Sequence, residues 1–346
     1  MKRIILAVCL IFLLTIPVQA AELTAPEAPE EAEDLVPREP ETFGEGLWYV
    51  VRHAAAELEP ALAQAAKSCL CVCAAVLLTA TLHFFADEKQ KTADLVCTLA
   101  IGTILLGPAN TLIRLGTETI YSLSEYGKLL LPVMTTALAA QGGPVTSAAL
   151  YAGTMGFNTV LGAILSRLFN PCVYIYLTLS IAESAMCEQM LKKLRDFVKW
   201  MMTWILKSAI FIYSAYMGVT GVISGNADAS ALKMTKIAIS GMVPVIGGML
   251  SDASETILVS AGVVKNAVGI YGLLAVLAIW IRPFIRIGTQ YLLLKLTAAV
   301  CGVYGSRESS ELIQDFSGAM GLILAAVGTM CLLLLISTIC FIKGAG

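Results

Sequence analysis

Long apolar runs that do not alternate with polar residues are the feature that most constrains this chain. Hydrophobic residues make up 58% of the sequence, charged residues make up 14%, and the mean hydropathy is +0.80. A soluble chain would carry about 25% charged residues, and each of its helices would keep a polar face. The runs are therefore expected to cross a membrane, which takes about 20 apolar residues per helix.

Apolar runs of this kind recur between residues 67 and 346, the segment expected to form a multi-span membrane domain. They predict an all-α polytopic membrane protein with about eight transmembrane helices. Several runs are short for a bilayer, so the sequence places their ends only approximately. The predicted spans are Ser68–Ala86, Leu95–Ile113, Val145–Ser166, Cys172–Cys187, Trp200–Ile223, Ala267–Ile281, Ile285–Tyr304 and Gly318–Ile342.

Three different segments precede this domain. Residues 1–20 have the parts of a signal peptide, with basic Lys2 and Arg3, an apolar run and a small-residue cleavage site, which predicts an extracytoplasmic mature N-terminus. An uncleaved anchor helix is the alternative. Residues 21–45 are rich in proline and acidic residues and predict a disordered, solvated linker. Residues 46–66 predict an amphipathic helix.

Two further apolar stretches, Leu129–Ala149 and Ile239–Thr256, are each interrupted by a proline and a glycine pair. Proline removes a backbone donor, and glycine permits backbone angles that are closed to other residues. Membrane helices are interrupted only where protein or a water-filled path satisfies the freed backbone groups. Half-helices meeting at a flexible joint are expected in both stretches, either with polar side chains that simply cap the next helix or as a gate. The candidate gate residues are Pro132, Gly142, Gly143, Pro244, Gly247, Gly248 and Asp252.

The two stretches also suggest an internal repeat with units 129–187 and 239–304. Pro132 and Pro171 in the first unit match Pro244 and Pro283 in the second at similar spacing. A duplication and a coincidence in a glycine-rich chain both remain open. If the repeat is real, the number of spans between the units decides between inverted and parallel symmetry, and transporters use both.

Two lysines lie inside apolar runs, where a charge at the bilayer centre costs about 3 kcal/mol on insertion scales. Lys207 is close enough to the start of its run for its side chain to reach the interface. Lys295 is nearer the middle, and it is the better candidate for facing a cavity or pairing with an acid such as Glu183. The alternatives are that Lys295 also reaches the interface or that the span is placed wrongly.

The stretch Cys187–Trp200 predicts an interfacial helix with an apolar face opposite a basic one. This helix is either an ordinary cytoplasmic loop helix or a docking surface for a partner. Its candidate docking residues are Lys192, Lys193, Arg195 and Lys199.

Motifs for catalysis, cofactors and metals are missing from the sequence. His53 and His83 are the only histidines, and no metalloprotease, nucleophile-elbow or phosphate-loop pattern occurs. On a helix, Cys69 and Cys73 share a face while Cys71 points nearly opposite, so the three cannot bind one ion. We expect buried apolar cysteines, no enzyme activity, no cofactor and no nucleic-acid binding.

The second interrupted stretch and its flanks resemble the stage III sporulation protein AE family of endospore-forming bacteria. The residues that carry the resemblance are 243–247 (VPVIG), 251–253 (SDA) and 265–272 (KNAVGIYG). Residues 146–150 (TSAAL) after the first glycine pair also resemble that family, and the likeness covers nearly the whole chain. One departure is that Tyr151 is followed by alanine, where the family often has proline.

The resemblance implies a mother-cell protein of the outer forespore membrane and a component of the stage III A sporulation complex, which includes an ATPase. Such complexes meet stage II sporulation protein Q from the forespore and form a channel needed for forespore gene expression. The family has no assigned catalytic residues. A permease-like role in that channel is the main hypothesis. An independent secondary transporter of a small solute and a non-conducting scaffold are the alternatives.

Overall fold

A computed structural model describes residues 25–30, 32–37, 43–85, 90–141, 144–186, 188–242, 247–304 and 307–343, with side chains in the same ranges except at 82–94, 221–265 and 304. The described part is helical and contains no strand. Its elements are η1 (Glu33–Leu35), α2 (Phe43–Ala54), η2 (Ala55–Glu57), α3 (Leu58–Phe85), α4 (Gln90–Ala140), α5 (Pro144–Ile164), the π-helical η3 (Leu165–Phe169), α6 (Asn170–Met186), α7 (Gln189–Met242), α8 (Gly247–Tyr304) and α9 (Arg307–Lys343).

The prediction of an all-α polytopic membrane protein is confirmed. In the described residues, six helical stretches are long and apolar enough to cross a membrane. They are 32 to 46 residues long, which at 1.5 Å per residue is on the order of 50 to 70 Å and exceeds a single hydrocarbon core. The stretches are Phe43–Thr81, Leu95–Ala140, Pro144–Met186, Gln189–Thr220, Asn266–Val303 and Arg307–Lys343.

The structure differs from the sequence prediction in joining runs that were expected to be separate spans. The runs on either side of Arg167 form one helical stretch, Pro144–Met186, with a π-helical turn between them. The runs on either side of Pro283 are likewise parts of α8, which continues through this proline. Hydropathy falls at Arg167 and near Pro283, but a helix packed against neighbours does not need to end there.

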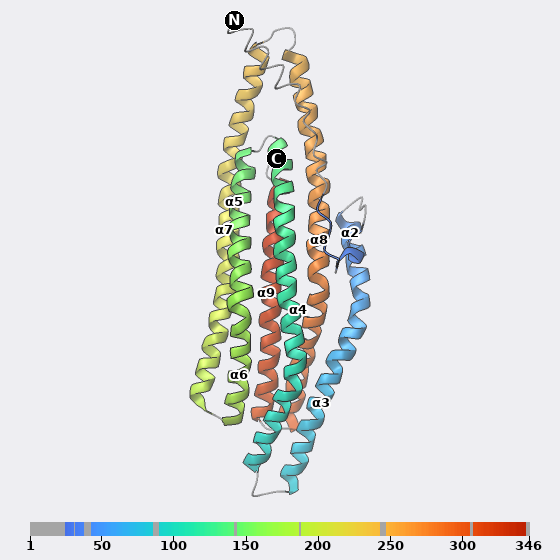
Figure 1. The fold of residues 1–346 in the computed structure, drawn as a ribbon, viewed down its shortest axis with the longest axis vertical. Coiled ribbons are helices and arrows are strands. Elements are labelled where there is room, and N and C mark those ends of the chain that lie inside the picture. The colour runs from blue at the N-terminus through green and yellow to red at the C-terminus, as the bar shows by residue number, and fades with distance from the viewer. Residues whose placement is uncertain are drawn as a thin grey trace.

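Each interrupted stretch contains the end of one long helix and the beginning of the next (Figure 1). Helix α4 continues through Pro132, contrary to the expected break there, and ends at Ala140 just before the glycine pair. The next helix, α5, begins at Pro144. Proline suits the first position of a helix because it lacks an N–H, and an N–H at that position would have no hydrogen-bond partner within the helix. In the second stretch, α7 ends at Met242 and α8 begins at Gly247.

The structure describes only some of the candidate gate residues. Gly142, Gly143 and Pro244 lie outside the described residues, and so does part of the second repeat unit. The backbone of Gly247, Gly248 and Asp252 belongs to the beginning of α8. The gate and the repeat remain predictions.

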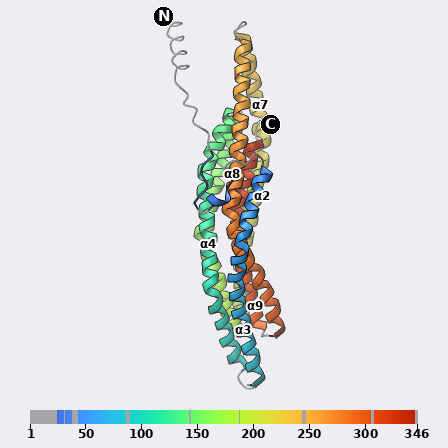
Figure 2. The same ribbon diagram turned by 90° about the vertical axis from the view of Figure 1, so that its right-hand side faces the viewer.

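Helix α9 lies along the middle of the bundle and contacts α4, α5, α6, α7 and α8 (Figure 1). Its sequence is apolar around the whole helix between Gly318 and Ile342, as expected of a helix with neighbours on every side. Helices α2 and α3 pack along the outside of α8, in both views (Figures 1 and 2). The centre of the bundle is therefore occupied by protein.

The acidic segment before α2 differs from the predicted solvated linker where it is described. Residues 25–30 and 32–37, called the strap below, lie against α8 and include the short helix η1. Ala32 and Leu35 are 2% and 1% exposed. Glu33 and Asp34 remain on the solvent side. The apolar residues of this proline-rich segment are spaced so that they share one side, and that side is buried. The overall composition of the segment, which is acidic, does not reveal this spacing.

Candidate functional site

A buried ion cluster joins three helices near the end of the bundle where α6 meets α7. Arg195 of α7 is 6% exposed, on the same inward side as Val198 and Met202. Its Nη1 donates to Oδ2 of Asp315 on α9 at 2.5 Å and to Oε2 of Glu183 on α6 at 3.0 Å. A buried charge is tolerated only when it is paired and hydrogen-bonded, and both conditions hold here.

Further groups surround this cluster. The Tyr176 hydroxyl donates to Oδ1 of Asp315 at 3.0 Å. Nε and Nη2 of Arg195 both donate to Oδ1 of the more exposed Asp196, at 3.1 and 3.0 Å. Lys199 Nζ lies 6.0 Å from the centre of the Tyr176 ring. The guanidinium therefore has a carboxylate on each of its edges.

A cavity of about 440 Å³ adjoins the cluster. On its rim, Glu311 accepts from Lys192 Nζ at 3.2 Å and from Arg307 Nε at 2.8 Å. The cavity lies between the last residues of α6 and the first turns of α7 and α9. Its lining residues are Glu183, Ser184, Gln189, Lys192, Lys193, Asp196, Arg307, Glu308 and Glu311.

The predicted docking helix corresponds to the first turns of α7. Met190 and Phe197 of its apolar face are 80% and 55% exposed. Arg195, expected on the accessible basic side, is inside. Carboxylates on α6 and α9 draw the arginine inward, and the apolar residues are left on the outer side of a helix in a membrane protein. Lys193 and Lys199 remain exposed, and Lys192 is held by Glu311.

The two lysines within apolar runs are both exposed. Lys295 does not line either of the two cavities described here and does not pair with Glu183, so its place in a polar path stays a prediction. Its Nζ lies 3.3 Å from the Tyr291 hydroxyl and 5.5 Å from the centre of the Tyr291 ring, one turn earlier on α8. Glu183 has Arg195 as its cation instead. Lys207 of α7 is exposed, and the interfacial position of its side chain stays a prediction.

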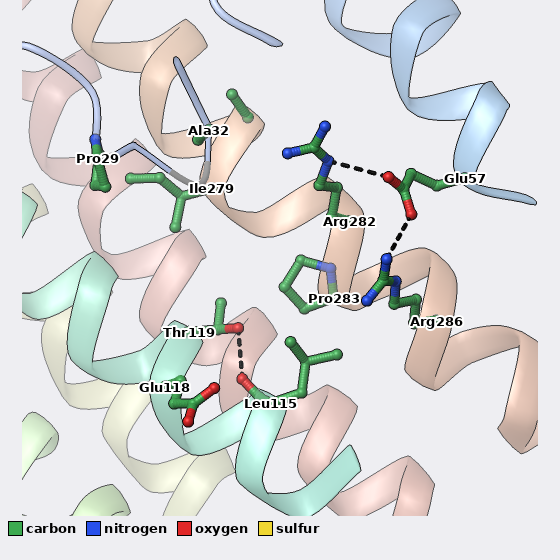
Figure 3. Close-up of a pocket in the computed structure, with 11 residues that line it drawn as sticks. Pro29, Ala32, Glu57, Leu115, Glu118, Thr119, Ile279, Arg282, Pro283 and Arg286 are labelled. Carbon is green, nitrogen blue, oxygen red and sulfur yellow. Dashed lines mark hydrogen bonds and ion pairs between the residues drawn. The ribbon is translucent and has the colours of Figure 1, made fainter. Parts of the chain in front are cut away.

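A second cavity, of about 390 Å³, lies between α4, α8 and the strap (Figure 3). At one end Glu57 bridges two arginines of α8, with Oε2 accepting from Arg286 Nη2 at 2.8 Å and Oε1 lying 3.4 Å from Arg282 Nε. Arg282 Nη2 also donates to Oδ2 of Asp34 in the strap at 2.5 Å. The remaining lining residues are Pro29, Ala32, Leu115, Glu118, Thr119, Ala278, Ile279 and Pro283.

The sequence alone did not predict this second site. Arg282 lies between two predicted spans, Arg286 lies within the predicted span Ile285–Tyr304, and Glu57 lies in the predicted amphipathic segment 46–66. One feature of the sequence could have indicated the site, namely two arginines four residues apart within an apolar region. Charged side chains in such regions of membrane proteins usually face a partner or a cavity. The partners themselves come from segments more than 200 positions away, which no local pattern reveals.

Polar groups are also buried higher in the bundle. The Thr154 hydroxyl of α5 lies 2.9 Å from that of Ser337 and 3.2 Å from that of Tyr213. Asn158 Nδ2 donates to the Ser124 carbonyl at 3.0 Å. These contacts join α5 to α4, α7 and α9 through hydrogen bonds that lipid cannot replace.

The cysteines are mostly buried, as expected, although Cys71 is exposed. Cys73 Sγ on α3 lies 4.0 Å from Cys301 Sγ on α8. Within the described part of the chain, no group of three or more His, Cys, Asp or Glu residues is arranged to hold a metal ion.

Comparisons with known proteins point to one family. The family model described as stage III sporulation protein AE matches residues 46–346. A curated relative, stage III sporulation protein AE of Bacillus subtilis (strain 168), is 22% identical over 254 residues. The alignment covers 73% of this chain and 64% of the relative, so it spans just under two thirds of the relative's length. No solved structure matches the chain.

Proposed function

The chain belongs to the stage III sporulation protein AE family, and on that premise we propose that it is a permease-like membrane component of the stage III A sporulation complex. The observation that carries the proposal is the family match over residues 46–346, which includes every candidate membrane-crossing helix except the first few residues of one. In this role it lies in the outer forespore membrane on the mother-cell side, with its mature N-terminus extracytoplasmic. With a forespore partner, the complex forms a channel needed for forespore gene expression.

The packing of α9 bears on where such a channel would run. Because α9 is surrounded by five helices and largely buried, the axis of a single bundle is filled by side chains. The conduit would therefore run between this protein and other subunits, with the bundle forming part of its wall. The energy would come from a partner ATPase, since the sequence has no phosphate-binding loop.

The experiment that tests this role replaces Gly247 or Gly248 at the start of α8 with tryptophan in sporulating cells. If the beginning of α8 lines the path, both variants assemble with their partners but stop forespore gene expression. A matched control is Gly218→Trp on α7, because an added Cβ at Gly218 meets no atom within 4 Å. Normal forespore expression in both variants, with normal assembly, would rule out a path at this position.

The alternative of an independent transporter is favoured by one observation, the buried cluster of Arg195, Glu183 and Asp315. Ionisable side chains buried in a membrane bundle commonly mark ion or substrate pathways. Purified protein in liposomes that moves a small solute without partners, and loses this activity on Glu183→Gln, would establish a transporter in place of a complex subunit.

The scaffold alternative is favoured by the exposed side of the first turns of α7. Lys193 and Lys199 lie there with the exposed Met190, Phe197 and Trp200. If α7 is a docking face, replacing Lys193 and Lys199 with glutamine should abolish partner recruitment while the tryptophan variants at Gly247 and Gly248 have no effect.

A further inference from the structure

A row of exposed side chains runs along one line of α7. Its members are spaced three and four residues apart, a spacing that places side chains one above the other on a helix. The row, called the α7 row below, consists of Lys193, Phe197, Trp200, Trp204, Lys207 and Phe211. The rings of Phe197 and Trp200 have centroids 5.9 Å apart, and those of Trp200 and Trp204 are 6.5 Å apart. These three side chains are each more than half exposed. The bundle therefore presents stacked aromatic rings with a lysine beyond each end.

The exposed charges along this part of α7 are mainly positive. Between residues 189 and 227 the sequence has one acidic residue, Asp196, and its carboxylate accepts two hydrogen bonds from Arg195. Lys193, Lys199 and Lys207 are exposed. This side of the helix is therefore complementary to an anionic group.

The uncharged length of α7 beyond the α7 row matches a bilayer. Residues 208–227 carry no charged side chain, and Asp228 follows them. The helix is continuous through this range, and about 20 helical residues rise about 30 Å, which is about the thickness of the hydrocarbon core. Phe211 and Val219 within it are more than half exposed, as expected of side chains that face lipid. The hydrocarbon core is therefore expected to begin just after Lys207.

A cation on the neighbouring helices lies at the same level. The Thr154 hydroxyl of α5 lies 3.2 Å from that of Tyr213 on α7, and the Tyr176 ring of α6 lies below Lys199 of α7, 6.0 Å from its Nζ. These two contacts show that α5 and α6 run antiparallel to α7. Arg167 lies between the two contacts along the chain, which places it level with the tryptophans of the α7 row, and it is exposed. Two neighbouring helical stretches thus carry an exposed cation at one height.

We propose that the α7 row lies in the headgroup region of the membrane and binds an anionic phospholipid. The lysines pair with lipid phosphate, since anionic membrane surfaces attract basic segments beside them. Trp200 and Trp204 lie among the headgroups, where indole has its apolar body in the acyl region and its N–H in water. Lys207 reaches back toward them, because helical side chains lean toward the N-terminus of the helix. The inference does not depend on the proposed role in a channel.

This placement also gives a depth to the buried ion cluster. Arg195 and the cavity beside it are on the N-terminal side of the tryptophans on α7. They then lie outside the hydrocarbon on this side of the bundle. The crossing of α7 begins about two turns later than the predicted span Trp200–Ile223.

The first test locates the start of the hydrocarbon, with the full chain in nanodiscs that hold one copy each. Lys193→Cys and Phe211→Cys are made separately, and alkylation of each new thiol by a membrane-impermeant maleimide is followed by mass spectrometry of its peptide. Each rate is divided by the rate of the same peptide in the denatured chain. Both positions are exposed in the bundle, so burial by protein does not distinguish them. Phe211→Cys should react at least about tenfold more slowly, because apolar surroundings disfavour the thiolate. Equal rates would overturn the placement.

The second test identifies the lipid. The protein is taken from nanodiscs of phosphatidylglycerol and phosphatidylcholine in equal parts, and the lipid it retains is counted by native mass spectrometry. Phosphatidylglycerol should be retained in preference, and Lys193→Gln or Lys207→Gln should each lower its retention about fivefold. Lys295→Gln, at an exposed lysine of α8, is the matched control and should leave retention unchanged. Equal loss in all three variants would show a general attraction to anionic lipid, and that result or a lack of preference would overturn the site.

A second copy of this chain is the competing occupant of the same side of α7. Nanodiscs that hold two copies should give the same alkylation rate for Phe211→Cys as nanodiscs that hold one. A fast rate with one copy that falls with two copies would show that α7 pairs with α7, and the lipid proposal would fail.

Discussion

Arg195 of α7 donates through Nη1 to Oδ2 of Asp315 on α9, 120 positions later in the chain, at 2.5 Å. The same nitrogen donates to Glu183 of α6, so a single guanidinium joins three helices. An arginine that the sequence placed on an accessible docking face is therefore part of the interior. Its replacement should affect folding as well as any docking surface.

Replacing Arg195 with methionine should destabilise the protein by about 3 to 5 kcal/mol, because Glu183 and Asp315 would stay buried without their cation. Denaturant unfolding in detergent, followed by circular dichroism or tryptophan fluorescence, measures the change. Lys193→Met is the matched control on the same helix. Lys193 is exposed, and its replacement should change stability by no more than about 0.5 kcal/mol.

The cluster also predicts a rescue. The triple variant Arg195→Met, Glu183→Gln and Asp315→Asn removes the unpaired charges and should recover part of the lost stability. A triple variant less stable than Arg195→Met alone would contradict the view that uncompensated burial of charge causes the loss.

Two glycines on α5, three residues apart, should respond oppositely to alanine. A Cβ at Gly153 would overlap the ring of Tyr216, whose hydroxyl donates to the Ala149 carbonyl at 2.9 Å, so Gly153→Ala should cost about 1 to 3 kcal/mol. A Cβ at Gly156 meets nothing within 4 Å, so Gly156→Ala should stabilise the helix by about 0.5 to 1 kcal/mol. Thermal unfolding of both variants in the same detergent gives the comparison. Equal shifts would show that α5 and α7 do not pack as described.

Replacing Lys295 with methionine should change stability by no more than about 0.5 kcal/mol and leave sporulation intact. Lys295 is exposed, and its described contact is with Tyr291 on its own helix. Spore counts together with unfolding curves measure both effects. A strong sporulation defect in a stably folded Lys295→Met protein would instead support a function for this lysine in a polar path.

Mild oxidation with copper phenanthroline should join α3 and α8 through a disulfide between Cys73 and Cys301, whose sulfurs lie 4.0 Å apart. The copper complex accepts the two electrons and the solvent takes the two thiol protons. Mass spectrometry of linked peptides detects the product. Cys73→Ser should abolish it, whereas Cys71→Ser, on the exposed side of the same helix, should not. Linked peptides that contain Cys71 instead would place α3 in a different rotation.

Several features could be predicted from local sequence because they depend on local chemistry. The all-helical architecture follows from apolar runs in which every backbone group must bond within its own helix. The burial of most cysteines follows from their apolar surroundings. The stop of α4 just before Gly142 follows from the glycine pair, although the expected break at Pro132 is wrong. A proline within a membrane helix is tolerated when neighbouring groups compensate for the lost hydrogen bond.

Other features depend on segments far away in the chain. The inward turn of Arg195 requires carboxylates on α6 and α9. The docking of the strap requires Arg282 on α8, 248 positions from Asp34. Separate predicted spans became parts of single long helices because packing along their whole length outweighs a local drop in hydropathy. None of these relationships has a period or a spacing that a scan of one segment could detect.

The sequence by itself determined that this is a helical membrane protein and which family it resembles, since hydropathy and short motifs are properties of neighbouring residues. Only the tertiary structure decided which charges are inside, that α9 fills the centre of the bundle, and that the acidic segment lies on α8. The physical reason is that a charge or an apolar side chain is stabilised by whatever surrounds it. Those surroundings are assembled from helices that are distant in the sequence.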